Sequence, residues 1–134
     1  MVKVDLPPEP RSATRARQLT REQLASACPE EAVEVAALLV TELVSNAILH
    51  ARTDIVLIVD VVPGRVVLRV RDGSDIAPVA RGYGTEAATG RGIALVEQLA
   101  SEWGVDHADG GKEVWCRIDF DAALDSPSAD EAAP

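Results

Sequence analysis

The sequence predicts an α+β protein, a two-layer α/β sandwich with helices on one face of a mixed, mainly antiparallel sheet. The first observation is the order of hydrophobic periods along the chain, which reads β-α-α-β-β-loop-α-β-β. The second is a pair of turn segments, Pro63-Gly64 and Asp109-Gly110-Gly111, each placed between two strand-like runs. Hairpins of this kind make neighbouring strands antiparallel, and a sheet with one apolar face needs helices to cover it.

The N-terminal region should form a short strand and a first helix. Val2–Leu6 suits a strand, three prolines follow, and Ser12–Ala27 has apolar residues at helical spacing. This helix carries the basic cluster of the chain, which consists of Arg11, Arg15, Arg17 and Arg21. We favour a solvated helix face for this cluster, and a partner-docking surface is the alternative.

The segment Pro29–Arg52 predicts one long helix around which the fold is organised. Proline and two acidic residues suit its first turn. Its apolar face, expected to pack on the sheet, consists of Ala36, Val40, Leu43, Ala47 and Ala51. Glu42, Asn46 and His50 recur four residues apart, and we place them on the opposite face. A polar row in apolar surroundings suggests a pocket wall, although a solvated face is the commoner outcome.

The remaining segments predict two hairpins separated by a loop and a helix. Asp54–Val62 reads as a buried strand, and Arg65–Arg71 as its alternating return strand. Trp103–His107 and Glu113–Phe120 form the second hairpin, and the inward residues of its second strand are Val114, Cys116, Ile118 and Phe120. The glycine-containing run 76–90 should be a loop that leads into a helix with Ile93, Val96, Leu99 and Ala100 on one face.

Length and composition indicate one domain, residues 1–120, followed by a disordered acidic tail, 121–134. The formal charge of −9 argues against nonspecific binding to nucleic acid or to an anionic membrane. We see no apolar run of transmembrane length and expect a cytoplasmic protein. Cys28 and Cys116 make neither a disulfide framework nor a zinc-binding pair.

Several residues have the chemistry of a nucleotide site. The glycines of Gly90-Arg91-Gly92 would let backbone N–H groups approach a phosphate at a helix N-terminus. Asn46 offers an amide oxygen of the kind that Mg²⁺ accepts, and Glu42 could take a proton from an attacking hydroxyl or water. Asp72 could accept a hydrogen bond from an exocyclic amino group. The chain lacks a P-loop motif.

Three segments resemble the conserved boxes of the GHKL ATPases, and most closely those of bacterial anti-sigma-factor serine/threonine kinases. The N, G1 and G2 boxes correspond to LLVTELVSNAILHA, VRDGS and TGRGIALVEQLASEWGV, and the later GGKEVWCRI resembles the closing hairpin. The resemblance covers about residues 6–120 and implies the Bergerat-type ATP-binding fold, with ATP and Mg²⁺ as cofactors.

The resemblance also implies a role for each matching residue. Glu42 would be the general base, Asn46 the Mg²⁺ ligand and Asp72 the carboxylate that binds the adenine amino group. The remaining nucleotide-binding positions would be Ser74, which stands where the G1 box has its first glycine, and Gly90, Arg91 and Gly92 of the lid. We assign no chemistry to His50, which could equally be a capping or core histidine.

The leading hypothesis is therefore a protein serine/threonine kinase that phosphorylates an antagonist protein and sequesters a sigma factor. The resemblance also suggests a homodimer. The first alternative is a non-catalytic ATP-binding module that acts by docking alone. A histidine-kinase catalytic domain is disfavoured because the chain has no room for a phosphoacceptor hairpin, and a structural protein without a ligand is the remaining alternative.

Overall fold

The structure, a computed structural model, describes residues 1–74, 94–108 and 110–121. Its elements are β1 (Val2–Leu6), α1 (Pro10–Leu24), α2 (Glu30–His50), β2 (Ile55–Val62), β3 (Arg65–Asp72), β5 (Glu102–Ala108) and β6 (Gly111–Asp119). Residues 94–99 are also helical. The strands form one sheet in the order β1-β2-β3-β6-β5, and every described pairing is antiparallel. The predicted α+β class is confirmed.

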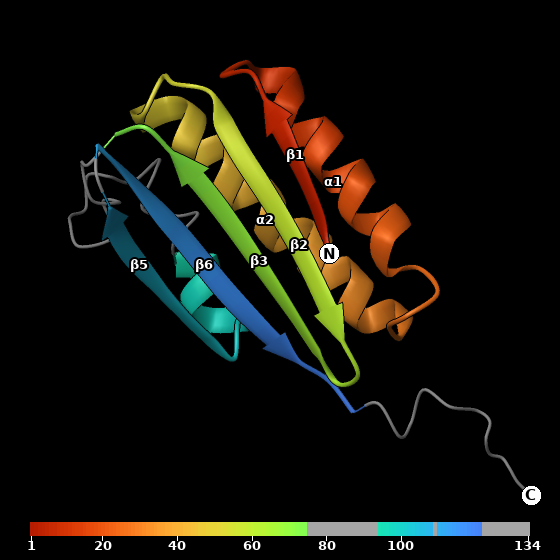
Figure 1. Cartoon of the computed structure of the whole chain (residues 1–134). Coiled ribbons are helices and arrows are strands. Elements are labelled where there is room, and N and C mark those ends of the chain that lie inside the picture. Colours follow the sequence, from red (N-terminus) through yellow and green to blue (C-terminus); the bar gives the residue numbers. More distant parts are fainter. Residues whose placement is uncertain (75–93, 109, 122–134) are drawn as a thin grey trace, which may run out of the picture.

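The molecule has two layers. Figure 1 shows α1, α2 and the helical residues 94–99 on one side of the sheet, and no helix of the described residues lies on the other face. α2 crosses β2, β3 and β6, and α1 packs beside α2 over β2. The core between the layers is aliphatic, since the largest fully buried side chains are leucines, isoleucine and valines. This agrees with the low aromatic content of the sequence.

The long helix α2 is shorter than predicted by one residue at its start and two at its end. Pro29 is the N-cap, with extended φ and ψ of −64° and 152°, so the helix begins at Glu30. Its apolar face is buried as expected at Ala36, Val40, Leu43 and Ala47. Arg52 has a φ of 57°, a left-handed conformation that non-glycine residues seldom adopt, and the helix has ended before it.

One expectation about α2 is wrong. We expected no apolar run of transmembrane length, yet this helix of 21 residues has a mean hydropathy of 1.8, long and apolar enough to cross a membrane. Half of that apolar window is buried inside the fold. The helix needs apolar residues on several sides, because α2 packs against α1 as well as against three strands. By these contacts α2 is a core helix of the sandwich.

The strands agree with the predicted pattern, with small shifts of their ends. β2 begins at Ile55 and not at Asp54, and β5 and β6 each begin earlier than predicted. The inward side chains of β6 are Lys112, Val114, Cys116 and Ile118, all buried. Leu99 was placed on the buried face of its helix with Val96, but it is 41% exposed whereas Val96 is fully buried.

Candidate functional site

Three elements meet at one end of the sheet. The C-terminal half of α2, the end of β3 and the beginning of β6 converge there, at the upper left of Figure 1. Because β3 and β6 are antiparallel, the last residue of β3 faces the start of β6, and Asp72 is the register partner of Lys112. Both side chains point to the helical side of the sheet, where α2 covers them.

Asp72 and Lys112 form a buried ion pair. The Lys112 ammonium Nζ donates to Asp72 Oδ2 at 2.9 Å and to Oδ1 at 3.2 Å. The side chains are only 3% and 1% exposed. A carboxylate in this position cannot be left without donors, and the ammonium supplies them. The pair therefore forms part of the floor of the site and also contributes to the stability of the fold.

Lys112 was missed by the sequence analysis, which treated this strand as beginning at Glu113. The signal that could have found it is period two, because Lys112 is in phase with the inward residues Val114 and Cys116. A lysine at the end of a strand is ordinarily solvated, so the pattern alone favoured an outward side chain.

A small cavity of about 10 Å³ lies above this pair. It is lined by Leu43, Asn46, Ala47, His50, Val70, Asp72, Lys112 and Val114. Two buried polar atoms at the cavity, Asn46 Oδ1 and His50 Nε2, have no hydrogen-bond partner among the described residues. Burial lowers the pKa of His50, and the nearby Lys112 charge lowers this pKa further. His50 is therefore favoured as neutral imidazole.

The prediction that the polar row of α2 faces away from its apolar side is wrong. Asn46 and His50 line the same cavity as Leu43 and Ala47. On a helix of 3.6 residues per turn, residue 46 lies 100° from residue 47, beside the apolar stripe and not opposite it. Glu42, one turn before Asn46, is partly exposed and does not line the cavity. It makes no hydrogen bond or ion pair within the described ranges.

The end of β3 is held in place by local hydrogen bonds. The backbone N–H of Ser74 donates to Asp72 Oδ1 at 2.8 Å, and that of Gly73 donates to Thr53 Oγ1 at 2.8 Å. Ser74 thus contacts the Asp72 carboxylate through its backbone. Gly90, Arg91 and Gly92, together with the expected loop, lie outside the described residues, as does nearly all of the expected tail. Their roles, and those of Glu42, Asn46, Asp72 and Ser74, stay predictions.

A magnesium ion would have few protein ligands at this site. The described part of the chain contains no group of three His, Cys, Asp or Glu residues that could hold a metal. Asn46 does fit the ion, because its Oδ1 is buried and has no other partner there. Mg²⁺ commonly takes one or two protein oxygens and completes its shell with phosphates and water.

Comparisons with known proteins agree with this architecture. No curated protein matches the sequence. Among solved structures, the chain is similar to the RsbU and RsbW domains of Rv1364c from Mycobacterium tuberculosis, with a TM-score of 0.65 and 21% identity. The match covers 89% of the present chain and 32% of the matched chain, so the present chain spans about a third of the length of that structure. At this identity the similarity shows the fold alone.

The sequence comparison identifies a family as well as a fold. The sequence pattern of the histidine kinase-like ATPase domain matches residues 6–118. That range includes α2, the end of β3 and almost all of β6, which are the elements that build the site. The chain belongs to the histidine kinase-like ATPase domain family, an ATP-binding fold of the GHKL type.

Proposed function

We propose that this protein is a cytoplasmic, ATP-dependent serine/threonine kinase of the anti-sigma-factor type. It would sequester a sigma factor and phosphorylate an antagonist protein, and this phosphorylation would control release of the sigma factor. The observation that supports the nucleotide part is the cavity between α2 and the sheet. It has a buried carboxylate at its floor and, at its wall, Asn46 Oδ1, which has no partner among the described residues.

Different residues would bind the nucleotide and catalyse the transfer of phosphate. Asp72 would accept from the base, and Asn46 would hold Mg²⁺, which neutralises charge on the phosphates when bound. The glycines of the 90–92 segment would approach the phosphates through their N–H groups. Glu42 stands one turn along α2 from Asn46 and is partly exposed, so that a hydroxyl of the antagonist could reach it.

A second candidate function is a binding module that acts by docking without transferring phosphate. One observation favours it: the carboxylate expected to bind the base is already engaged by Lys112, in a cavity with room for about one water molecule. A protein whose nucleotide site binds weakly could still sequester a partner. The two functions differ in one measurable step, which is transfer of the γ-phosphate.

The deciding experiment compares the wild type with Glu42→Gln. Both proteins receive γ-labelled ATP and Mg²⁺ in a lysate that contains the natural antagonist, and a single labelled small protein is expected with the wild type. Glu42→Gln should lower the transfer rate by about 10²–10⁴-fold, because an amide cannot take the proton. ATP affinity, measured by calorimetry, should hardly change.

Two further variants control this result. Glu31→Gln removes an exposed carboxylate at the other end of the same helix and should leave both transfer and binding unaltered. Asn46→Ala should reduce both, because it removes the metal ligand. Equal transfer by wild type and Glu42→Gln would exclude Glu42 as the base. ATP binding without transfer to any protein would leave the docking module as the function.

A further inference from the structure

The buried pair at the floor of the site has hydrogen-bonding capacity left over. An ammonium has three N–H donors, and Lys112 directs two contacts to the Asp72 oxygens. Asp72 Oδ1 also accepts from Ser74, whereas Oδ2 accepts only from Lys112 among the described residues. Within the described part of the chain, one N–H of Lys112 and one lone pair of Asp72 Oδ2 thus have no partner at the cavity floor.

The opposite wall of the cavity gives a second, independent indication of a polar ligand. Asn46 Oδ1 and His50 Nε2 are buried there without partners among the residues described, and such atoms are costly unless something satisfies them. The aliphatic side chains of Leu43, Ala47 and Val70 line the space between wall and floor. Apolar walls with a few convergent polar groups suit a flat heterocycle.

The ion pair should persist when a ligand enters. Removing Lys112 from Asp72 would leave a buried charge unpaired, which is the least favourable way to open the site. The cavity of about 10 Å³ must therefore widen at its rim, where the partly exposed Asn46 and His50 side chains lie. The ligand then meets Asp72 and Lys112 as one acceptor–donor edge.

We propose that Lys112 is a specificity-determining residue of the nucleotide site and reads the base together with Asp72. The proposal rests on the nucleotide binding proposed above. In adenine, the exocyclic N6–H would donate to Asp72, and ring N1 would accept from Lys112. Guanine presents these groups in the reverse order, with an acceptor at O6 and a donor at N1–H. In the same pose O6 would face the Asp72 carboxylate and N1–H the Lys112 ammonium, so the pair selects adenine. A carboxylate alone would reject guanine at O6 only, whereas the pair rejects it at both positions.

The test uses a nucleotide altered at one atom, 1-deaza-ATP, in which a C–H group replaces ring N1. Calorimetry on the wild-type protein should show 1-deaza-ATP binding about tenfold or more weakly than ATP, since Lys112 loses a charge-assisted hydrogen bond. GTP should bind about a hundredfold or more weakly than ATP, because guanine mispairs with both groups. No substitution is needed for this arm, so it cannot fail through misfolding.

Variants assign the effect to Lys112. In Lys112→Met the difference between ATP and 1-deaza-ATP should vanish, and the preference for ATP over GTP should fall, because the ammonium that donates to adenine N1 and opposes guanine N1–H is gone. Lys112→Arg, which keeps a donor, should restore part of the difference. Lys3→Met, which removes an exposed lysine on β1, should leave all three affinities as in the wild type.

The outcomes separate the two proposals. Equal binding of ATP and 1-deaza-ATP to the wild type would show that Lys112 does not contact the base, and would overturn this inference while ATP binding stands. GTP bound as tightly as ATP would also overturn it. If the wild type binds none of the three nucleotides, the proposed function itself falls, and this inference falls with it.

Discussion

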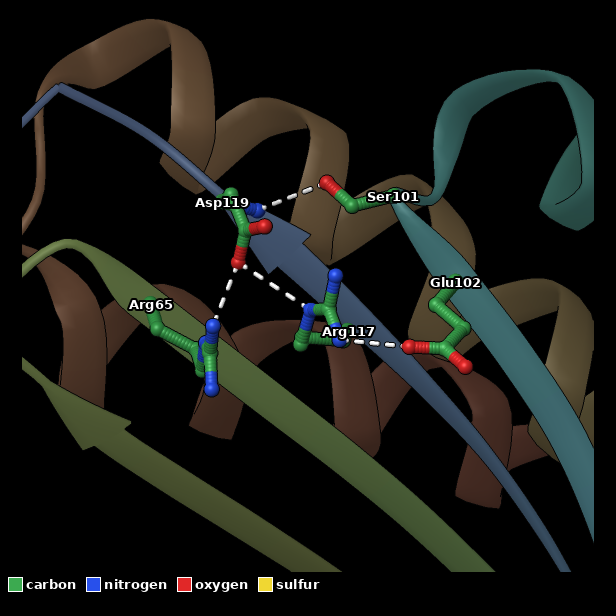
Figure 2. A network of polar contacts seen from close by, with 5 residues as sticks. All are labelled: Arg65, Ser101, Glu102, Arg117 and Asp119. Atoms are coloured by element: carbon green, nitrogen blue, oxygen red, sulfur yellow. Dashed lines mark hydrogen bonds and ion pairs between the residues drawn. The ribbon is translucent and has the colours of Figure 1, made fainter.

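Strands β3 and β6 are joined near each end by ion pairs, and two of these differ sharply in exposure: Lys112–Asp72 on the helical face at the site end, and the cluster around Asp119 at the far end. At the site end, Lys112 and Asp72 are almost completely enclosed. At the far end, Asp119 accepts from Arg65 at 3.1 Å and from Arg117 at 3.2 Å, with side chains 27–51% exposed. Figure 2 shows this second cluster, in which Arg117 also reaches Glu102 on β5.

The difference lies in the water around the charges. Exposed pairs gain little, because solvent screens the attraction and both side chains lose freedom, so each contributes roughly 0–1 kcal/mol. A buried pair gains more from its attraction but must offset the loss of hydration, and removing one partner leaves the other charge stranded. The exposed cluster therefore contributes little to the free energy of unfolding. The buried pair contributes to stability, and the proposed nucleotide binding would depend on the same two side chains.

The largest effect is expected from breaking the buried pair on one side only. Lys112→Met should lower the free energy of unfolding by about 3–5 kcal/mol, because Asp72 is left buried without its counterion. The double variant Lys112→Met, Asp72→Asn should recover most of this loss. Urea unfolding of the two variants measures it. Equal stability of the single and double variants would show that the charges are not coupled.

A second test changes the backbone beside the pair. An alanine at Gly111 would place its Cβ against the backbone carbonyl of Asp72, and should cost about 1–3 kcal/mol through overpacking. Gly104→Ala is the matched control on the neighbouring strand. Its Cβ would lie 2.8 Å from the Trp115 indole, a half-buried side chain that can move aside. Thermal unfolding should rank Gly111→Ala below Gly104→Ala, and the reverse order would contradict this account.

A smaller effect is expected from the exposed cluster. Asp119→Asn removes the charge shared by Arg65 and Arg117, and should change the free energy of unfolding by less than about 1 kcal/mol. The change should shrink further in high salt, because the Debye length falls. Chemical unfolding at two salt concentrations tests this. A loss comparable to that of Lys112→Met would mean that exposure does not separate the two clusters.

The smallest effect concerns pH and again belongs to the buried end. The pKa of His50 is lowered in the folded protein, so the unfolded chain binds its proton first as the pH falls. The stability linked to neutral His50 is present above the unfolded value of about 6.5 and is lost as the pH falls through the folded pKa. In His50→Gln the unfolding free energy should fall less steeply as the pH drops below about 6.5. His107→Gln, at an exposed site on β5, is the matched control variant.

Much of the fold could be predicted because its signals are local. The alternation in β3 can be recognised from a few consecutive residues, and the helical spacing in α2 from a few turns. Part of the site was predictable for the same reason, since Asn46 and His50 recur on one helix. The face of α2 on which they lie was not, because a spacing of four residues fixes their neighbours on the helix but not what covers them.

What the sequence determined by itself is the order of the elements, the identity of the apolar faces and the presence of boxes typical of an ATP-binding family. What only the tertiary structure decided is the partner of Asp72. Lys112 is 40 residues away in the chain, and the two meet because the register of β3 with β6 sets them opposite one another. Register is settled by the packing of whole strands against a common core, and no local pattern around either residue contains that information.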